Sequence, residues 1–252
     1  MLTSIGWIGN ALMAIILYRA FRAKLFGKYP FFYSYLAVVL VAGILLGFVY
    51  HPNSATYKKW YSVANYPTML LGCGIVLEIF NHALQAYPGA SRFARISGYI
   101  VFGLVFCYAL VYPSLTASSA HTGTAIEFER DLRTVQAIFL FGLLAVISYY
   151  RIAVGKNVKG IAMGYGLFIG TSLMSVALRS YIGPSFYPAA SFVQPLSYVV
   201  CLCIWTYALW SYQPNPASDS TIRIEADYEV FVARTKEMLG ALRSQLGKAT
   251  RP

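Results

Sequence analysis

The sequence predicts an all-α polytopic membrane protein, a bundle of seven transmembrane helices followed by one more helix at the carboxyl-terminal end. Two observations carry this prediction. The chain holds seven long stretches with almost no charge, and basic residues occupy every second gap between them. A helix needs about 20 mainly apolar residues to cross a bilayer, since each residue adds about 1.5 Å along the axis. The expected spans lie near residues 2–22, 30–50, 61–84, 97–116, 132–151, 160–182 and 190–212.

The composition agrees with a membrane protein. Of 252 residues, 58% are hydrophobic and 12% are charged, whereas about 25% are charged in an average soluble domain. The net charge of +11 would suit a nucleic-acid-binding protein, but the basic residues are spread among the gaps between apolar stretches. We therefore expect no nucleic-acid partner. The expected partner is the lipid bilayer, and in a bacterium the expected location is the plasma (inner) membrane.

The placement of the basic residues predicts the orientation. The gaps after the first, third and fifth spans hold no acidic residue, and their basic residues are Arg19, Arg22, Lys24, Lys28, Arg92, Arg95, Arg151, Lys156 and Lys159. The alternate gaps hold fewer basic residues or balance them with acidic ones. Loops rich in Lys and Arg stay in the cytoplasm. The amino terminus is therefore expected outside and the carboxyl terminus in the cytoplasm.

The spans differ in what they predict about packing. The first is expected to be a retained helix, because its positive charges follow the apolar run, the reverse of a cleavable signal. Glycines four residues apart share one helix face, and such pairs are Gly43 with Gly47, Gly160 with Gly164, and Gly166 with Gly170. Small residues at this spacing allow close helix contact in lipid, so the sixth helix is expected to be closely packed. The alternative is that these glycines allow movement or line a cavity.

The composition changes after Tyr212, which divides the chain into a seven-helix domain (1–212), a linker (213–221) and a cytoplasmic tail (222–252). The linker is polar and contains proline, whereas the tail is expected to form one amphipathic helix. Its apolar stripe consists of Tyr228, Phe231, Met238, Leu242 and Leu246. Such a helix could lie on the membrane, associate with its own copy, or bind a cytoplasmic protein through residues 225–247.

Glu78 and His82 are the first candidate functional residues, because polar groups at membrane depth are costly. Glu78 follows an apolar run in the third span, and His82 lies four residues later on the same helix face. Three interpretations stay open for this intramembrane pair. They are a structural ion pair with Arg19, Arg22 or Arg151, a proton relay, and a ligand contact.

A second candidate group lies near the outer face. Arg130, Asp131 and Arg133 open the fifth span, and Arg179 ends an otherwise uncharged run in the sixth. Asp131 at a helix start would be favoured by the helix dipole. Arg179 could extend to the headgroups, pair with an acidic residue such as Asp131, or help form an outer pocket for an anionic or carbonyl-bearing ligand. Gln136, further along the fifth span, is one more polar group at depth.

The layout is similar to that of rhodopsins and G-protein-coupled receptors in helix count and orientation, and the resemblance ends there. No lysine occurs from Pro184 to Ser220, so the Schiff base of retinal is not expected. His51, His82 and His121 fall at different depths, which excludes a haem bound by two histidines. Binding of a haem or pigment by His82 alone is the alternative that stays open. The four cysteines lie in predicted spans without metal-ligand spacing. No cofactor and no metal are therefore expected.

No catalytic motif occurs in the chain, so the expected function is non-enzymatic. The favoured hypothesis is a receptor-like sensor or adaptor, in which an outer pocket or a membrane partner is coupled to the cytoplasmic helix. One alternative is a small proton-coupled transporter using Glu78 and His82, although no internal repeat typical of transporters is found. The other is an accessory membrane subunit of a larger complex.

Overall fold

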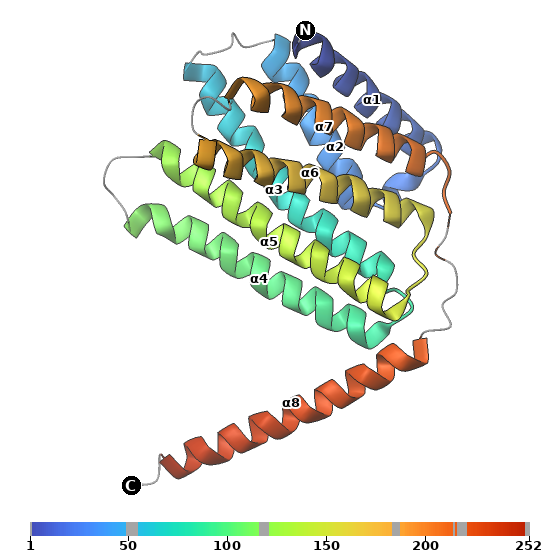
Figure 1. Cartoon of the computed structure of the whole chain (residues 1–252), viewed down its shortest axis with the longest axis vertical. Coiled ribbons are helices and arrows are strands. Elements are labelled where there is room, and N and C mark those ends of the chain that lie inside the picture. Colours follow the sequence, from blue (N-terminus) through green and yellow to red (C-terminus); the bar gives the residue numbers. More distant parts are fainter. Residues whose placement is uncertain are drawn as a thin grey trace.

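The computed structural model describes residues 2–48, 55–115, 121–182, 187–213, 215 and 221–249. Every regular element among these residues is a helix. This confirms the all-helical fold. Seven α-helices run alongside one another in a bundle, and the eighth projects away from it (Figure 1). The helices are α1 (Leu2–Arg22), α2 (Pro30–Phe48), α3 (Ala55–Ala83), α4 (Pro88–Leu115), α5 (His121–Tyr150), α6 (Lys156–Ile182), α7 (Tyr187–Ala208) and α8 (Thr221–Ala249), with a short 3-10 helix η1 (Leu25–Gly27) after α1.

Three helices of the described chain are long and apolar enough to cross a membrane, which is compatible with a membrane location. The spanning windows are Pro30–Gly47 in α2, Val63–Ala83 in α3 and Arg130–Tyr150 in α5, and α7 holds a shorter apolar stretch, Phe192–Ala208. Only 22% of the α2 window is buried inside the bundle, against 44% of the α3 window. Helix α2 is therefore covered less by the rest of the bundle than α3 is. Seven spans with an outer amino terminus stay a prediction.

Several helices begin earlier than the predicted spans, because polar residues continue the helix beyond the apolar run. The largest difference is in α5, which begins at His121, although its span was predicted from residue 132. Arg130, Asp131 and Arg133 consequently lie within the helix. The interpretation of Asp131 as a residue at the helix start is therefore wrong.

The bundle is closest at α6 and α7. A Cβ atom on Gly160 would overlap the side chain of Ala208, and one on Gly164 would overlap the indole of Trp205. Trp205 is fully buried and donates its Nε1–H to the carbonyl of Ile161 at 3.4 Å. The close packing predicted for Gly160 and Gly164 is thus confirmed. The second pair is looser, since a Cβ on Gly166 would lie 3.2 Å from Leu140 and one on Gly170 would meet nothing within 4 Å.

Helix α3 occupies the centre of the bundle, where it packs against α2, α4, α5 and α6. We call the end of the bundle at which α1, α3, α5 and α7 finish the tail end, because the chain leaves it toward α8 (Figure 1). The opposite end is the head end. The tail end is the side that the sequence predicts to be cytoplasmic.

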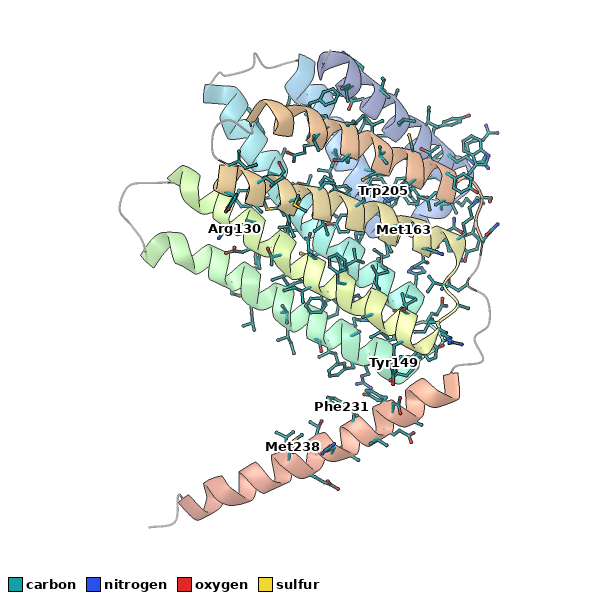
Figure 2. All side chains as sticks on the ribbon, viewed as in Figure 1. Arg130, Tyr149, Met163, Trp205, Phe231 and Met238 are labelled. Atoms are coloured by element: carbon teal, nitrogen blue, oxygen red, sulfur yellow. The ribbon has the colours of Figure 1, made fainter. Side chains whose placement is uncertain are left out.

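Helix α8 meets the bundle near its own beginning. The ring of Phe231 packs edge-on against Phe93 of α4 with centroids 5.8 Å apart, and Tyr150 donates its hydroxyl hydrogen to Asp227 at 2.9 Å. Figure 2 shows Phe231 on the side of α8 that faces the bundle, while Met238 lies further along the projecting helix. Among the stripe residues whose side chains the structure describes, Phe231 and Met238 are more than half exposed. The apolar stripe is therefore only partly covered.

Candidate functional site

The Glu78 side chain caps the amino-terminal end of α2. Its side chain is 7% exposed, and its two carboxylate oxygens accept hydrogen bonds from the backbone N–H groups of Phe31 at 3.2 Å and Phe32 at 3.0 Å. The first N–H groups of a helix have no partner within it. Here Pro30 has no N–H, Phe31 and Phe32 donate to Glu78, and the N–H of Tyr33 donates to the carbonyl of Tyr29 at 3.1 Å. The N–H groups in the first turn of α2 therefore all have acceptors, and a residue of α3 supplies two of these.

The position of Glu78 is electrostatically favourable, because a helix amino end carries partial positive charge. Gly74, one turn earlier in α3, allows this approach, since a Cβ there would overlap the ring of Phe31. No ion pair joins Glu78 to a basic group among the described residues. Arg19, one of the predicted partners, instead donates to the carbonyl of Trp210 from Nη2 at 2.6 Å and from Nε at 3.0 Å.

His82 links the Glu78 region to the chain that follows α7. Its Nδ1 lies 2.9 Å from the backbone oxygen of Glu78, where the Nδ1–H tautomer donates, and its ring packs on Tyr29 with centroids 4.8 Å apart. The backbone oxygen of His82 accepts a hydrogen bond from Nδ2 of Asn215 at 2.5 Å. Glu78 and His82 are therefore neighbours through the backbone oxygen of Glu78, while the Glu78 carboxylate is directed to α2.

We call residues 209–213 and 215 the connector, because they lead from α7 toward α8. Asn157 holds it from the start of α6, donating to the carbonyls of Ala208 at 3.0 Å and Ser211 at 2.9 Å and accepting from the N–H of Gln213 at 2.6 Å. Asn215 accepts from the N–H of Gly155 at 2.9 Å. The connector is consequently tied to the tail end of the bundle by several hydrogen bonds.

A second buried polar cluster lies about halfway along the bundle. It borders a pocket with room for a water-sized molecule, which we call the mid-bundle pocket; its lining residues are Tyr35, Thr68, Met69, Leu132, Arg133, Gln136, Tyr165 and Phe168. The guanidinium of Arg133 lies over the ring of Phe168, 4.9 Å from its centroid. Tyr165 donates to Oε1 of Gln136 at 3.1 Å, and Nε2 of Gln136 lies 3.4 Å from the carbonyl of Met69. The pocket thus combines a cation, an amide and aromatic rings.

Two features of the sequence allow this arrangement: a glycine in α3 and the spacing of two polar residues in α5. Gly72 of α3 leaves space for the cluster, because a Cβ there would overlap the hydroxyl of Tyr165. Gln136 follows Arg133 by three residues in an apolar run, so both share one face of α5. That spacing is the signal that could have identified Gln136 as a site residue. Tyr165 has no such signal, since its role depends on where α6 packs.

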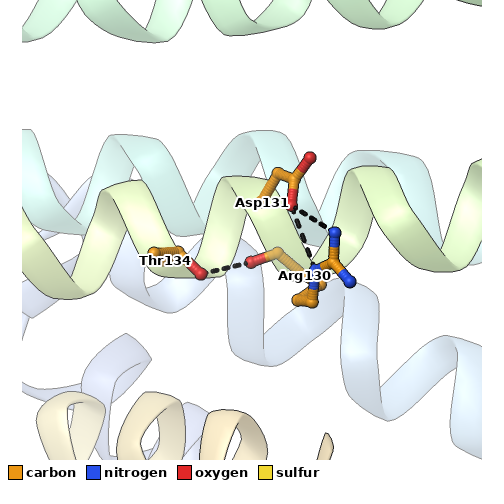
Figure 3. Close-up of polar contacts among 3 residues, drawn as sticks. All are labelled: Arg130, Asp131 and Thr134. Atoms are coloured by element: carbon orange, nitrogen blue, oxygen red, sulfur yellow. Dashed lines mark hydrogen bonds and ion pairs between the residues drawn. The ribbon is translucent and has the colours of Figure 1, made fainter. Parts of the chain in front are cut away.

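The predicted outer group is divided by the structure. Asp131 pairs with Arg130 at 3.1 Å, and Thr134 donates to the carbonyl of Arg130 at 2.8 Å (Figure 3). Both members of the pair are about half exposed, at 51% and 49%. Arg133 lies instead in the mid-bundle pocket. The side chain of Arg179 lies outside the described residues.

These contacts define an all-helical protein with apolar helices suited to a membrane, a closed polar site at Glu78 and a pocket at Arg133. No group of three or more His, Cys, Asp or Glu side chains that could hold a metal occurs among the described residues. No protein-family model, no curated protein and no solved structure matches the chain.

Proposed function

We propose that this chain is a non-enzymatic, seven-helix integral membrane protein with its amino terminus outside, and that it acts as a receptor-like sensor or adaptor. In this proposal the mid-bundle pocket, which has room for a water-sized group, receives one polar group of a ligand, such as a carboxylate or carbonyl oxygen. The connector and α8 carry the output on the cytoplasmic side. Arg133 and Gln136 supply a cation and hydrogen-bonding groups, which suit an anionic or carbonyl-bearing ligand.

One observation carries the proposal: the described residues form a continuous chain of contacts between the mid-bundle pocket and the connector. The first part is aromatic and runs through Tyr165, Phe168, Tyr198, Trp205 and Phe32, with successive centroids 6.2, 5.7, 6.4 and 5.1 Å apart. The second part consists of hydrogen bonds: the N–H of Phe32 donates to the Glu78 carboxylate, the His82 ring to the backbone oxygen of Glu78, and the Asn215 amide to the backbone oxygen of His82. Packed side chains and hydrogen-bond networks of this kind can couple two sites if the elements they join have two arrangements.

The transporter alternative has less support from the same contacts. A proton carrier must release its bonds when it is protonated and move its proton along a path. Both oxygens of Glu78 accept backbone N–H groups that begin α2, which suits a permanent structural carboxylate. In proteoliposomes, Glu78→Gln should therefore leave proton flux at the wild-type level. Flux that is present in the wild type and lost in Glu78→Gln would favour transport over sensing.

The coupling can be tested by filling the pocket from within. Thr68→Met adds volume to the pocket lining, whereas Leu70→Met changes a half-exposed residue on the same helix. Hydrogen exchange of the full-length protein in nanodiscs is measured over the connector and α8. We expect Thr68→Met to change the hydrogen-exchange rates of the connector, because contacts join the pocket to it. We expect Leu70→Met to leave these rates unchanged. Identical exchange in all three proteins would overturn the sensor proposal.

A further inference from the structure

A groove on the outside of the bundle, separate from the mid-bundle pocket, runs along α7 between α1 and the start of α6. Its volume is about 390 Å³, and its lining includes Leu12, Cys203, Thr206 and Tyr207. A smaller hollow between α1 and α7 continues it and shares Thr206 and Trp210 with it. Its walls are mainly apolar along α7. The groove is therefore an apolar surface depression near the tail end of the bundle.

Two basic residues stand at the tail-end mouth of this groove. Lys156 lines it directly, with Nζ 4.1 Å from the centroid of the Tyr207 ring, and Arg19 lines the adjoining hollow with its guanidinium 4.7 Å from the centroid of the Trp210 ring. No carboxylate of the described residues lies within ion-pair distance of either cation. The mouth thus carries positive charge that the described part of the protein does not neutralise.

The geometry also matches the dimensions of a lipid. Leu12 and Arg19 are seven residues apart on α1, so they share one face and are separated by about 10 Å along the axis. Tyr207 and Trp210 are largely exposed, as is typical of aromatic residues at the level of lipid headgroups. Charge at the mouth and apolar walls below it correspond to a headgroup and an acyl chain.

We infer that this groove binds an anionic phospholipid of the inner leaflet, with its phosphate between Lys156 and Arg19 and an acyl chain along Cys203 and Leu12. Basic pockets between helices on the cytoplasmic side bind such headgroups, and the tail end is the predicted cytoplasmic side. The inference rests on the membrane insertion proposed above and is independent of the sensor role.

The test measures lipid selectivity of the full-length protein. The protein is equilibrated with phosphatidylglycerol and phosphatidylcholine in equal amounts, and the lipids it retains are counted by native mass spectrometry. Wild type should retain phosphatidylglycerol in preference. Lys156→Gln should reduce that preference about five-fold, the factor expected when one cation beside an anionic headgroup is removed.

Two variants separate a specific site from general attraction. Arg92→Gln removes the same charge from an exposed position on α4, away from the groove, and should leave the preference unchanged. Cys203→Phe fills the groove without changing charge and should lower retention. Equal loss in Lys156→Gln and Arg92→Gln would show only bulk charge attraction and overturn the inference. So would the absence of a preference in wild type that flotation shows to be membrane-inserted, an outcome that leaves insertion and the sensor role intact.

Discussion

The two buried polar sites of the bundle are built in opposite ways. At Glu78 both carboxylate oxygens are used by backbone N–H groups of α2, and a ring and a glycine close the space around them. At Gln136 the hydrogen bonds join side chains and a carbonyl of two neighbouring helices at 3.1 to 3.4 Å, and the cluster borders a pocket. The difference teaches that a buried charge is not in itself a sign of a ligand site. A satisfied charge holds helices together, whereas a cluster with spare space can accept another molecule.

The largest expected effect is at the closed site. Glu78→Ala removes the acceptor of two backbone N–H groups, one of them buried, and should lower the free energy of unfolding by about 1.5–3 kcal/mol, the range for hydrogen bonds to a charged group. Unfolding in mixed micelles measures the loss. Glu78→Gln keeps one acceptor oxygen and should lose less. If Glu78→Ala is as stable as wild type, the closed site is not structural and the comparison fails.

A smaller effect is expected where the closed site meets the connector. Asn215→Ala removes the hydrogen bonds to Gly155 and His82 and should cost about 1 kcal/mol. The sharper measure is local, since hydrogen exchange of residues 209–213 should rise while exchange in α3 stays the same. The control beyond the connector is Asp227→Asn on α8, which changes the carboxylate that accepts the hydroxyl hydrogen of Tyr150. Unchanged exchange after Asn215→Ala would mean that other contacts hold the connector.

At the open site the expected loss of stability is lower than at the closed site. Gln136→Leu nearly preserves volume and gives up the hydrogen bonds to Tyr165, Met69 and Cys73. The free energy of unfolding should fall by about 1 kcal/mol, since interhelical hydrogen bonds in membranes average about 0.6 kcal/mol. Denaturation under the same conditions as for Glu78→Ala makes the comparison direct. A loss equal to that of Glu78→Ala would show that both sites are structural.

The smallest effect is expected at the exposed pair. Asp131→Asn breaks the contact with Arg130, but both side chains are about half exposed, and such pairs contribute about 0.2–1 kcal/mol. Its unfolding midpoint should stay within error of wild type, and raising the salt concentration should leave the wild-type value nearly unchanged. A marked loss would indicate that Asp131 has a further partner.

The fold was more predictable from the sequence than the site. Long apolar runs and glycines four apart indicate helices and their close faces, and both are seen at Gly160 and Gly164. Glu78 was singled out as a charged residue at membrane depth, but its contacts could not be predicted, because its partners are backbone N–H groups 46 and 47 residues earlier. Periodicity describes one helix at a time. The contacts that build the two polar sites join α3 to α2 and α5 to α6, and only three-dimensional packing reveals them.

The contribution of Glu78 to α2 has a consequence for how the chain is made. When α2 leaves the ribosome, the N–H groups of Phe31 and Phe32 have no acceptor within their own helix, and the residue that supplies one is synthesised after them. These groups are costly to leave without a partner in lipid. In the membrane insertion proposed above, the second and third helices are therefore expected to enter the bilayer together as a hairpin. A nascent chain that ends before residue 78 should insert less efficiently than one that includes it.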